Sequence, residues 1–145
     1  MNKIASLFLL IVFSSCGNTK DIVSVNHSNL PTAIGPYSHS VSYEDLLFIS
    51  GQIGIDPQSN ILREGIQEQT LQIFENLKTI LKDNNSDLDH IVKTTIFIRD
   101  MKQFEAVNKI YGSYFDKRFP ARSTIEVVSL PRNAAIEIEC IAIKK

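Results

Sequence analysis

The sequence predicts a single α+β domain in which two helices cover one face of a β-sheet. Two observations support this prediction. Several short runs rich in Val, Ile and Phe alternate like half-buried strands, and two longer segments repeat apolar residues every three or four positions, as one helix face does. The chain has 145 residues, 43% of them apolar, which suits one hydrophobic core and leaves little room for a second domain.

The first 15 residues have the layout of a signal peptide, in which Lys3 precedes the apolar run Ile4–Phe13 and two serines lead to Cys16. The run is about half as long as a helix that spans a hydrocarbon core of roughly 30 Å. A cysteine after small residues resembles the lipobox of bacterial lipoproteins. We therefore expect a signal peptide over residues 1–15, lipidation of Cys16, a polar tether over residues 16–26 and the domain over residues 27–145. An ordinary N-terminal strand or helix is the alternative, although the run has the period of neither.

The domain is expected to begin with two strands. Residues Ser38–Tyr43 mix polar and apolar side chains in short alternation, and Leu46–Ile53 is a β-rich run. Gly54, Asp56 and Pro57 follow it and are typical turn residues.

Two helices and a strand follow. The segment Gly65–Asp83 predicts an amphipathic helix, and the alternating run Ile91–Ile98 predicts a strand. Asp100 can accept hydrogen bonds from the free N–H groups at the start of a second helix. The apolar stripe of that helix consists of Met101, Phe104, Val107, Tyr111 and Phe115.

Strands over Ser123–Val128 and Ala134–Ile143 complete the order β-β-α-β-α-β-β. Two helices can cover only one face of such a sheet, whereas alternation leaves apolar residues on the other face. A closed homo-oligomer, a dimer or a trimer, is the commonest way to bury such a face. The apolar residues expected there are Phe97, Val128, Ile141 and Ile143.

Charged residues within the last two strands are the first candidates for function. Alternation places Glu137 and Glu139 on the uncovered face, and it groups Arg122 with Thr124, Glu126 and Val128. The guanidinium of Arg122 could bind a substrate carboxylate through two hydrogen bonds, or it could form an ion pair with Glu137, Glu139 or Glu126 at a subunit interface. The spacing alone favours the ion pair.

Several other kinds of site are disfavoured. The net charge is −1, so no basic surplus is available for nucleic acid, and the histidines and cysteines lack the spacing of metal ligands. Neither a nucleophile signature nor a phosphate-binding glycine loop is found. Cys140 is expected to face the helices as a small apolar residue. Tyr37, after a Gly-Pro turn, and Asn108, within the stripe of the second helix, could each line a pocket or hold local structure.

Six segments together resemble the Rid (YjgF) family of reactive-intermediate deaminases: IGPYS, FISGQI, IVKTTIFIRDM, AVNKIY, FPARSTIEV and LPRNAAIEIECIAI. The resemblance covers about residues 31–145. It implies a chorismate-mutase-like fold, a homotrimer whose sheets line a central barrel, and active sites in clefts between subunits. It also implies hydrolysis of 2-imino acids to 2-oxo acids and ammonia, without a metal or cofactor.

The resemblance assigns roles to individual residues. It implies that Arg122 holds the substrate carboxylate, that Glu137 orients or deprotonates the attacking water, and that Tyr37, Ser50 and Asn108 line the pocket. Thr124 stands where many members have cysteine, which affects the expected substrate preference more than the reaction type.

We therefore expect an exported, membrane-anchored lipoprotein of a bacterial cell envelope that deaminates reactive imines. The alternative is a non-catalytic trimeric module, tethered to a membrane, that binds small ligands or a client protein.

Overall fold

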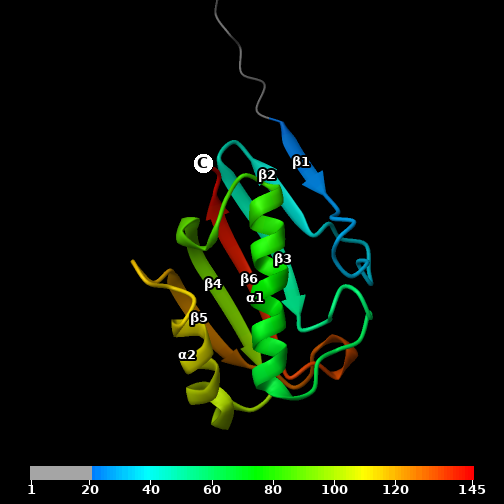
Figure 1. Cartoon of the computed structure of the whole chain (residues 1–145), viewed down its shortest axis with the longest axis vertical. Coiled ribbons are helices and arrows are strands. Elements are labelled where there is room, and N and C mark those ends of the chain that lie inside the picture. The colour runs from blue at the N-terminus through cyan, green and yellow to red at the C-terminus, as the bar shows by residue number, and fades with distance from the viewer. Residues whose placement is uncertain (1–20) are drawn as a thin grey trace, which may run out of the picture.

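The computed structural model describes residues 21–145 and contains one six-stranded sheet with two α-helices on one of its faces (Figure 1). The predicted α+β class is confirmed. The elements in chain order are β1 (Ile22–Val25), β2 (Ser40–Tyr43), β3 (Leu46–Ile53), α1 (Gly65–Asp83), β4 (Ile91–Ile98), α2 (Phe104–Gly112), β5 (Ala121–Glu126) and β6 (Ile136–Ile143).

The strand order is β1-β2-β3-β6-β4-β5, and β4 and β5 are the one parallel pair within residues 21–145. The chain crosses from β4 to β5 through α2, as a parallel connection requires. The last strand, β6, lies between β3 and β4 in the middle of the sheet. Alternate side chains of β6 are therefore buried against the helices: Ile136, Ile138, Cys140 and Ala142.

Helices α1 and α2 pack on the same side of the sheet and enclose the core. Aromatic rings fill the junction between them, where Phe74 of α1 stacks on Tyr114 with ring centroids 4.0 Å apart. Phe74 also meets Tyr111 and Phe115 edge to face. The hydroxyl groups of Tyr111 and Thr94 form a buried hydrogen bond of 2.9 Å that ties α2 to β4.

Most predicted boundaries agree with the structure, and those of β3, α1 and β4 agree at both ends. The Asp100 side chain caps the second helical segment by accepting a hydrogen bond from Lys102 N. A short 3₁₀ turn, Met101–Gln103, precedes α2, so the α-helical part is shorter than the predicted stripe.

The N-terminal prediction needs one correction. Ile22–Val25 forms β1, which pairs antiparallel with β2, whereas residues 16–26 were predicted to be a polar tether. The strand is short and mostly exposed, so it lacks the periodic burial that would reveal it in the sequence. The predicted signal peptide and Cys16 lie outside the described residues.

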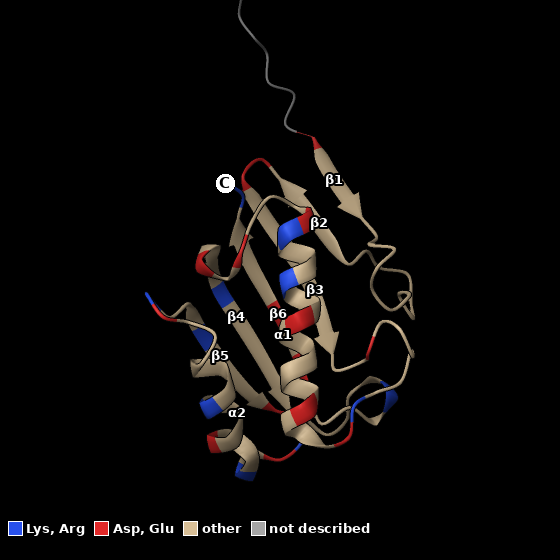
Figure 2. Cartoon of the chain, viewed as in Figure 1, with Lys and Arg blue, Asp and Glu red and all other residues tan. Residues whose placement is uncertain are grey.

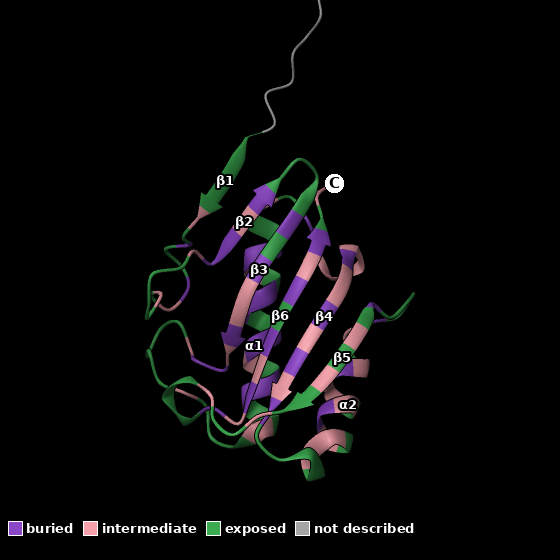
Figure 3. Ribbon diagram, turned by 180° about the vertical axis from the view of Figure 1, so that it is seen from behind, coloured by how far each residue is buried: buried purple, intermediate pink, exposed green. Residues whose placement is uncertain are grey.

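The face of the sheet opposite the helices has no covering layer within residues 21–145 (Figure 3). Strand alternation places on this face Leu46, Phe48, Phe97, Ile125, Ile141 and Ile143. Phe48 is 42% exposed, a large value for a phenylalanine on one of the interior strands of a sheet. Charged side chains of both signs are spread over the helices and loops (Figure 2). No helix within the described part of the chain is both long and apolar enough to cross a membrane.

Candidate active site

Glu137 lies against a cavity that two other predicted site residues, Tyr37 and Ser50, also line. It projects from β6 onto the uncovered face of the sheet, opposite the core residues Ile136 and Ile138. Its carboxylate lies over Gly51 of β3, where a Cβ atom would overlap Oε1. The β3–β6 register shifts between Ile49 and Gln52, so a bulge accompanies this close approach.

Burial raises the pKa of the Glu137 carboxyl, and the neighbouring carboxylate of Glu139 raises it further. A carboxylate with a raised pKa is a better proton acceptor than an exposed glutamate, and proton transfer in catalysis favours groups whose pKa approaches the working pH. Glu137 is therefore suited to accept a proton from water.

The cavity beside Glu137 has a volume of about 180 Å³ and carries polar groups at one end. Tyr37 reaches it from the Gly35–Pro36 turn, and its phenol oxygen accepts a weak hydrogen bond of 3.4 Å from Ile34 N. The Ser50 hydroxyl donates to the carbonyl oxygen of Ser38 at 2.7 Å. We call Tyr37, Ser50, Gly51 and Glu137 the Glu137 half-site. Its apolar walls are Ile34, Ile53 and Pro131.

Arg122 lies in a different place, beside α2. Its guanidinium carbon is 4.7 Å from the centroid of the Tyr111 ring and 5.6 Å from that of Phe104, so two aromatic faces hold the cation. Within residues 21–145 no carboxylate lies at ion-pair distance from Arg122. The guanidinium is thus available to an anionic ligand.

Two polar atoms near Arg122 are buried without a hydrogen-bond partner, Asn108 Oδ1 and Thr124 Oγ1. Native proteins rarely leave such atoms unpaired, so each marks a place where a ligand, water or another chain completes the structure. Thr124 lies two residues after Arg122 on the same side of β5, and Asn108 lies on α2 between Phe104 and Tyr111. We call Arg122, Asn108 and Thr124 the Arg122 half-site.

The predicted grouping of Arg122 with Val128 on the uncovered face is wrong. Arg122 pairs in register with Thr94, whose side chain is buried under α2, so Arg122 lies on the helix side. Strand β5 ends at Glu126, and for that reason alternation cannot be carried on to Val128. Within residues 21–145 Arg122 forms no ion pair with Glu126, Glu137 or Glu139, and the alternative of such a pair across a subunit interface stays a prediction. Glu126 instead accepts a hydrogen bond from Met101 N at 2.9 Å.

Within one chain the two half-sites are on opposite faces of the sheet. Arg122 is aligned with Thr94, and Glu137 with Phe97, so the two residues are two strands apart and also displaced along the strands. With strand spacings of about 4.8 Å and a rise of about 3.3 Å per residue, their backbones are separated by more than ~10 Å. The structure brings together Tyr37, Ser50 and Glu137, and separately Arg122, Asn108 and Thr124, but not the two groups.

Sequence analysis missed three residues that shape these half-sites. Phe104 and Tyr111 were assigned only to the apolar stripe of the second helix, yet their rings support Arg122. Gly51 was read only as part of a strand. A glycine inside a strand run is itself a sign of a bulge or a close approach, and that sign was available in the sequence.

Neither a reactive cysteine nor a metal-binding cluster contributes to this site within residues 21–145. Cys140 is buried as predicted, and burial raises the pKa of its thiol to about 12, so it stays protonated and unreactive near neutral pH. Within the described residues no three His, Cys, Asp or Glu side chains gather as a group that could hold a metal ion.

Residues 27–144 match the family model described as Endoribonuclease L-PSP. A mouse protein named 2-iminobutanoate/2-iminopropanoate deaminase is 41% identical over 121 residues, which cover 83% of this chain and 90% of the relative. Reactive Intermediate Deaminase A, chloroplastic, of Arabidopsis thaliana is also 41% identical, over 93% of this chain and 72% of its own length. A crystal structure of a conserved Rid family protein from Yersinia pestis superimposes with a TM-score of 0.82 at 43% identity, over 85% of this chain and 99% of that one.

Replacing Gly51 with alanine is expected to displace the Glu137 carboxylate, because the added methyl group and Oε1 cannot occupy the same space. Glu137 would then turn toward solvent, and its pKa would fall toward the ordinary value for glutamate. Titration of the Glu137 side-chain carbon by NMR measures this shift. The control is Gly112→Ala, where the added Cβ has no neighbour within 4 Å. An unchanged Glu137 pKa in Gly51→Ala would contradict the contact.

Proposed function

We propose that this chain, which belongs to the L-PSP or Rid family, hydrolyses 2-imino acids to 2-oxo acids and ammonia. The observation that carries the proposal is Arg122, a cation held between aromatic rings without a carboxylate partner in the described part of its own chain. The similarity to a protein named as a deaminase of such imines supports the same assignment.

Arg122 would bind the carboxylate of the imino acid. A guanidinium presents parallel N–H donors that match the two oxygens of a carboxylate, and the Tyr111 and Phe104 rings limit the directions in which it can point. Asn108 Oδ1 and Thr124 Oγ1 would supply further polar contacts to the bound substrate or to the chain that brings it. The polar atoms of the half-site would thereby find the partners that they lack.

Glu137 would activate the water. It takes a proton from water while the oxygen forms a bond to the iminium carbon, giving a carbinolamine. Glu137 returns that proton to the nitrogen, and the C–N bond then breaks so that ammonia leaves. Glu137 accepts the hydroxyl proton as the C=O bond forms and passes it to ammonia, so the products are a 2-oxo acid and an ammonium ion. The iminium carbon is already electrophilic, so positioning and one proton acceptor are sufficient.

The site would be assembled from two copies of the chain. A 2-imino acid is too short to contact Arg122 and Glu137 of one chain, because these residues lie on opposite faces of the sheet. The uncovered apolar face offers the surface for association, and a closed ring lets the Arg122 half-site of one subunit meet the Glu137 half-site of the next. We propose a homotrimer with a central barrel, as the family resemblance implies.

RNA is the substrate suggested by the description of the family model, but the charges of this chain favour a small molecule. The chain has a net charge of −1, and the Glu137 half-site adds a second carboxylate nearby, Glu139, which would repel phosphate groups. A single guanidinium suits one carboxylate better than a phosphate backbone.

The N-terminal sequence supports a further proposal, that the protein is exported and anchored by a lipid on Cys16. Replacing Cys16 with alanine is expected to move the protein from the membrane to the soluble fraction, because the attachment site is lost. Fractionation followed by immunoblotting measures the change. Equal membrane recovery of both chains would reject the anchor.

Replacing Arg122 with alanine is expected to lower kcat/KM for 2-iminobutanoate by about 10²-fold or more, since a charged contact to the substrate disappears. Ammonia release from imines generated in situ measures the rate, with spontaneous hydrolysis as the baseline. Lys82→Ala, which removes an exposed cation from α1, is the matched control. If the intact chain binds a 2-oxo acid but does not accelerate hydrolysis, the ligand-binding module replaces the enzyme.

Mixed oligomers of Arg122→Ala and Glu137→Gln chains are expected to regain activity that neither variant has alone. In a trimer containing both variants, one of three interfaces combines an intact Arg122 with an intact Glu137, so about one third of wild-type activity should return. Co-expression with two affinity tags and sequential purification isolates these oligomers. A mixed dimer would regain about one half. No recovery would mean that each site lies within one chain.

A further inference from the structure

A network of hydrogen bonds connects the segment after β1 to the start of β2 and to the end of α1. Its centre is a pair of buried histidines, His27 and His39, whose rings are stacked with centroids 6.0 Å apart. The proposed reaction uses neither histidine. The other members of the network are Asn26, Pro31, Ser40, Asp83 and Asn84.

The hydrogen bonds of His39 determine where its proton lies. Its Nδ1 accepts from the backbone N–H of His27 at 3.0 Å, so Nδ1 carries no proton. Its Nε2 is 2.9 Å from the carbonyl oxygen of Pro31, which can only accept, so Nε2 carries the proton and donates it. His39 is therefore a neutral side chain with both ring nitrogens engaged.

His27 holds this pair against α1. Its Nδ1 is 3.0 Å from Asp83 Oδ2 and its Nε2 is 3.3 Å from Ser40 Oγ. This order of Ser, His and Asp is that of a hydrolytic triad, but Ser40 is fully buried and no substrate can reach its hydroxyl. Asn84 also donates to Ser40 Oγ. The arrangement thus serves to hold structure.

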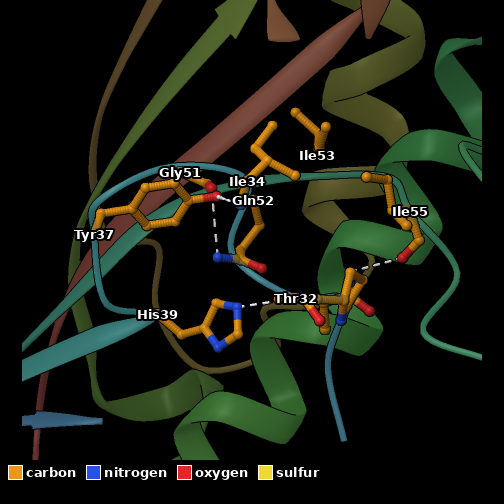
Figure 4. Close-up of a pocket in the computed structure, with 10 residues that line it drawn as sticks. Thr32, Ile34, Tyr37, His39, Gly51, Gln52, Ile53 and Ile55 are labelled. Atoms are coloured by element: carbon orange, nitrogen blue, oxygen red, sulfur yellow. Dashed lines mark hydrogen bonds between the residues drawn. The ribbon is translucent and has the colours of Figure 1, made fainter. Parts of the chain in front are cut away.

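The network ends at loop 31–37, and Figure 4 shows Thr32, Ile34 and Tyr37 of this loop with His39 around a pocket that neighbours the Glu137 cavity. Ile34 and Tyr37 also line the Glu137 cavity. Residues 31–37 include Ile34 and Tyr37, which are 49% and 43% exposed. The loop makes two hydrogen bonds within itself, Tyr37 N to Gly35 O and Ile34 N to the Tyr37 oxygen. To the remainder of residues 21–145 it makes one, in which Pro31 O accepts from His39 Nε2.

We propose that His39 is a positioning residue, which in its neutral form holds loop 31–37 so that Ile34 and Tyr37 close the Glu137 cavity, and which releases the loop when it is protonated. The effect on catalysis rests on the proposed function, whereas the effect on the loop does not.

Protonation breaks the network for a geometric reason. An imidazolium donates from both nitrogens, so its Nδ1–H would face the backbone N–H of His27, and the ring must move away from that N–H. The imidazole ring is rigid, so Nε2 moves with it and is drawn from the carbonyl oxygen of Pro31, through which the loop is held. The titratable groups around His39 are His27, Asp83 beyond it at the end of α1, and Tyr37 across the cavity. Asp83 is paired with His27, so it does not offset a charge on His39 directly.

The pKa of His39 agrees with this geometry. Burial lowers it from its ordinary value, the Pro31 hydrogen bond opposes that shift, and His27 lowers the pKa further. Since the unfolded chain binds the proton more readily than the folded one, this group's contribution to stability is fully present above about pH 6.5 and declines as the pH falls toward the lowered pKa.

Two substitutions of His39 test the proposal. Glutamine keeps one donor and one acceptor but does not titrate, whereas leucine provides neither. His90→Gln is the matched control, because His90 is a histidine paired with Asp87 in the 3₁₀ turn Leu88–His90 after α1 and is not a member of the network. Hydrogen exchange of the peptide spanning residues 31–37, corrected for the intrinsic pH dependence, reports whether the loop is held.

For the full-length wild type, exchange of this peptide should rise roughly five- to tenfold between about pH 7.5 and about pH 5, as expected when one hydrogen bond is lost. His39→Leu should show the faster exchange at both pH values, and His39→Gln the slower exchange at both. Imine hydrolysis should follow the same pattern, with a higher KM for His39→Leu. Glu137 is present in every variant, so its own titration affects the rate of imine hydrolysis equally in all of them. A difference between the pH profiles of wild type and His39→Gln therefore results from the titration of His39.

Exchange in the wild type that does not depend on pH, or that matches His39→Leu, would overturn the proposal. So would a His39→Gln profile that keeps the wild-type dependence. If the wild type hydrolyses no imine but its loop exchange follows the expected pattern, the proposed function fails while the positioning role of His39 stands.

Discussion

The alternation of side chains along β6 is the constraint on which the remainder of the molecule depends. Because β6 lies between β3 and β4, its inward residues form the centre of the core and its outward residues lie on the uncovered face. Ile138 is fully buried while Glu137, its neighbour, stands beside a cavity. A shift of one residue in register would exchange these two environments and lose both the core and the acid.

The same alternation divides the candidate chemistry between two faces. Helix α2 provides the rings that hold Arg122, and the bulge at Gly51 provides the space that Glu137 occupies. The two groups depend on different elements and do not meet in one chain. The proposed hydrolysis, which needs both groups, would therefore require an assembly, and the uncovered apolar face would then serve association and catalysis together.

The segment after β1 links the edge of the sheet to the cavity. It is anchored at His27 by the end of α1 and at His39 by the start of β2, and Ile34 and Tyr37 of its loop line the cavity beside Glu137. This places a buried histidine pair, of which His39 is neutral, beside the loop that lines the cavity where water would be activated. A group that loses hydrogen bonds on protonation is a physical route from pH to loop position.

The sequence by itself determined the class of the fold, the bounds of β3, α1 and β4, and the burial of Cys140, because these follow from periodic patterns of neighbouring residues. Alternation singled out Arg122 and Glu137 among the charged residues, and the family resemblance implied the roles proposed for them. Only the tertiary structure decided that they lie on opposite faces, that Ile22–Val25 is a strand and that His27 pairs with Asp83. These features depend on contacts between residues far apart in the chain, and His27 and Asp83, for example, are 56 positions apart. The periodic pattern of neighbouring residues does not predict such contacts.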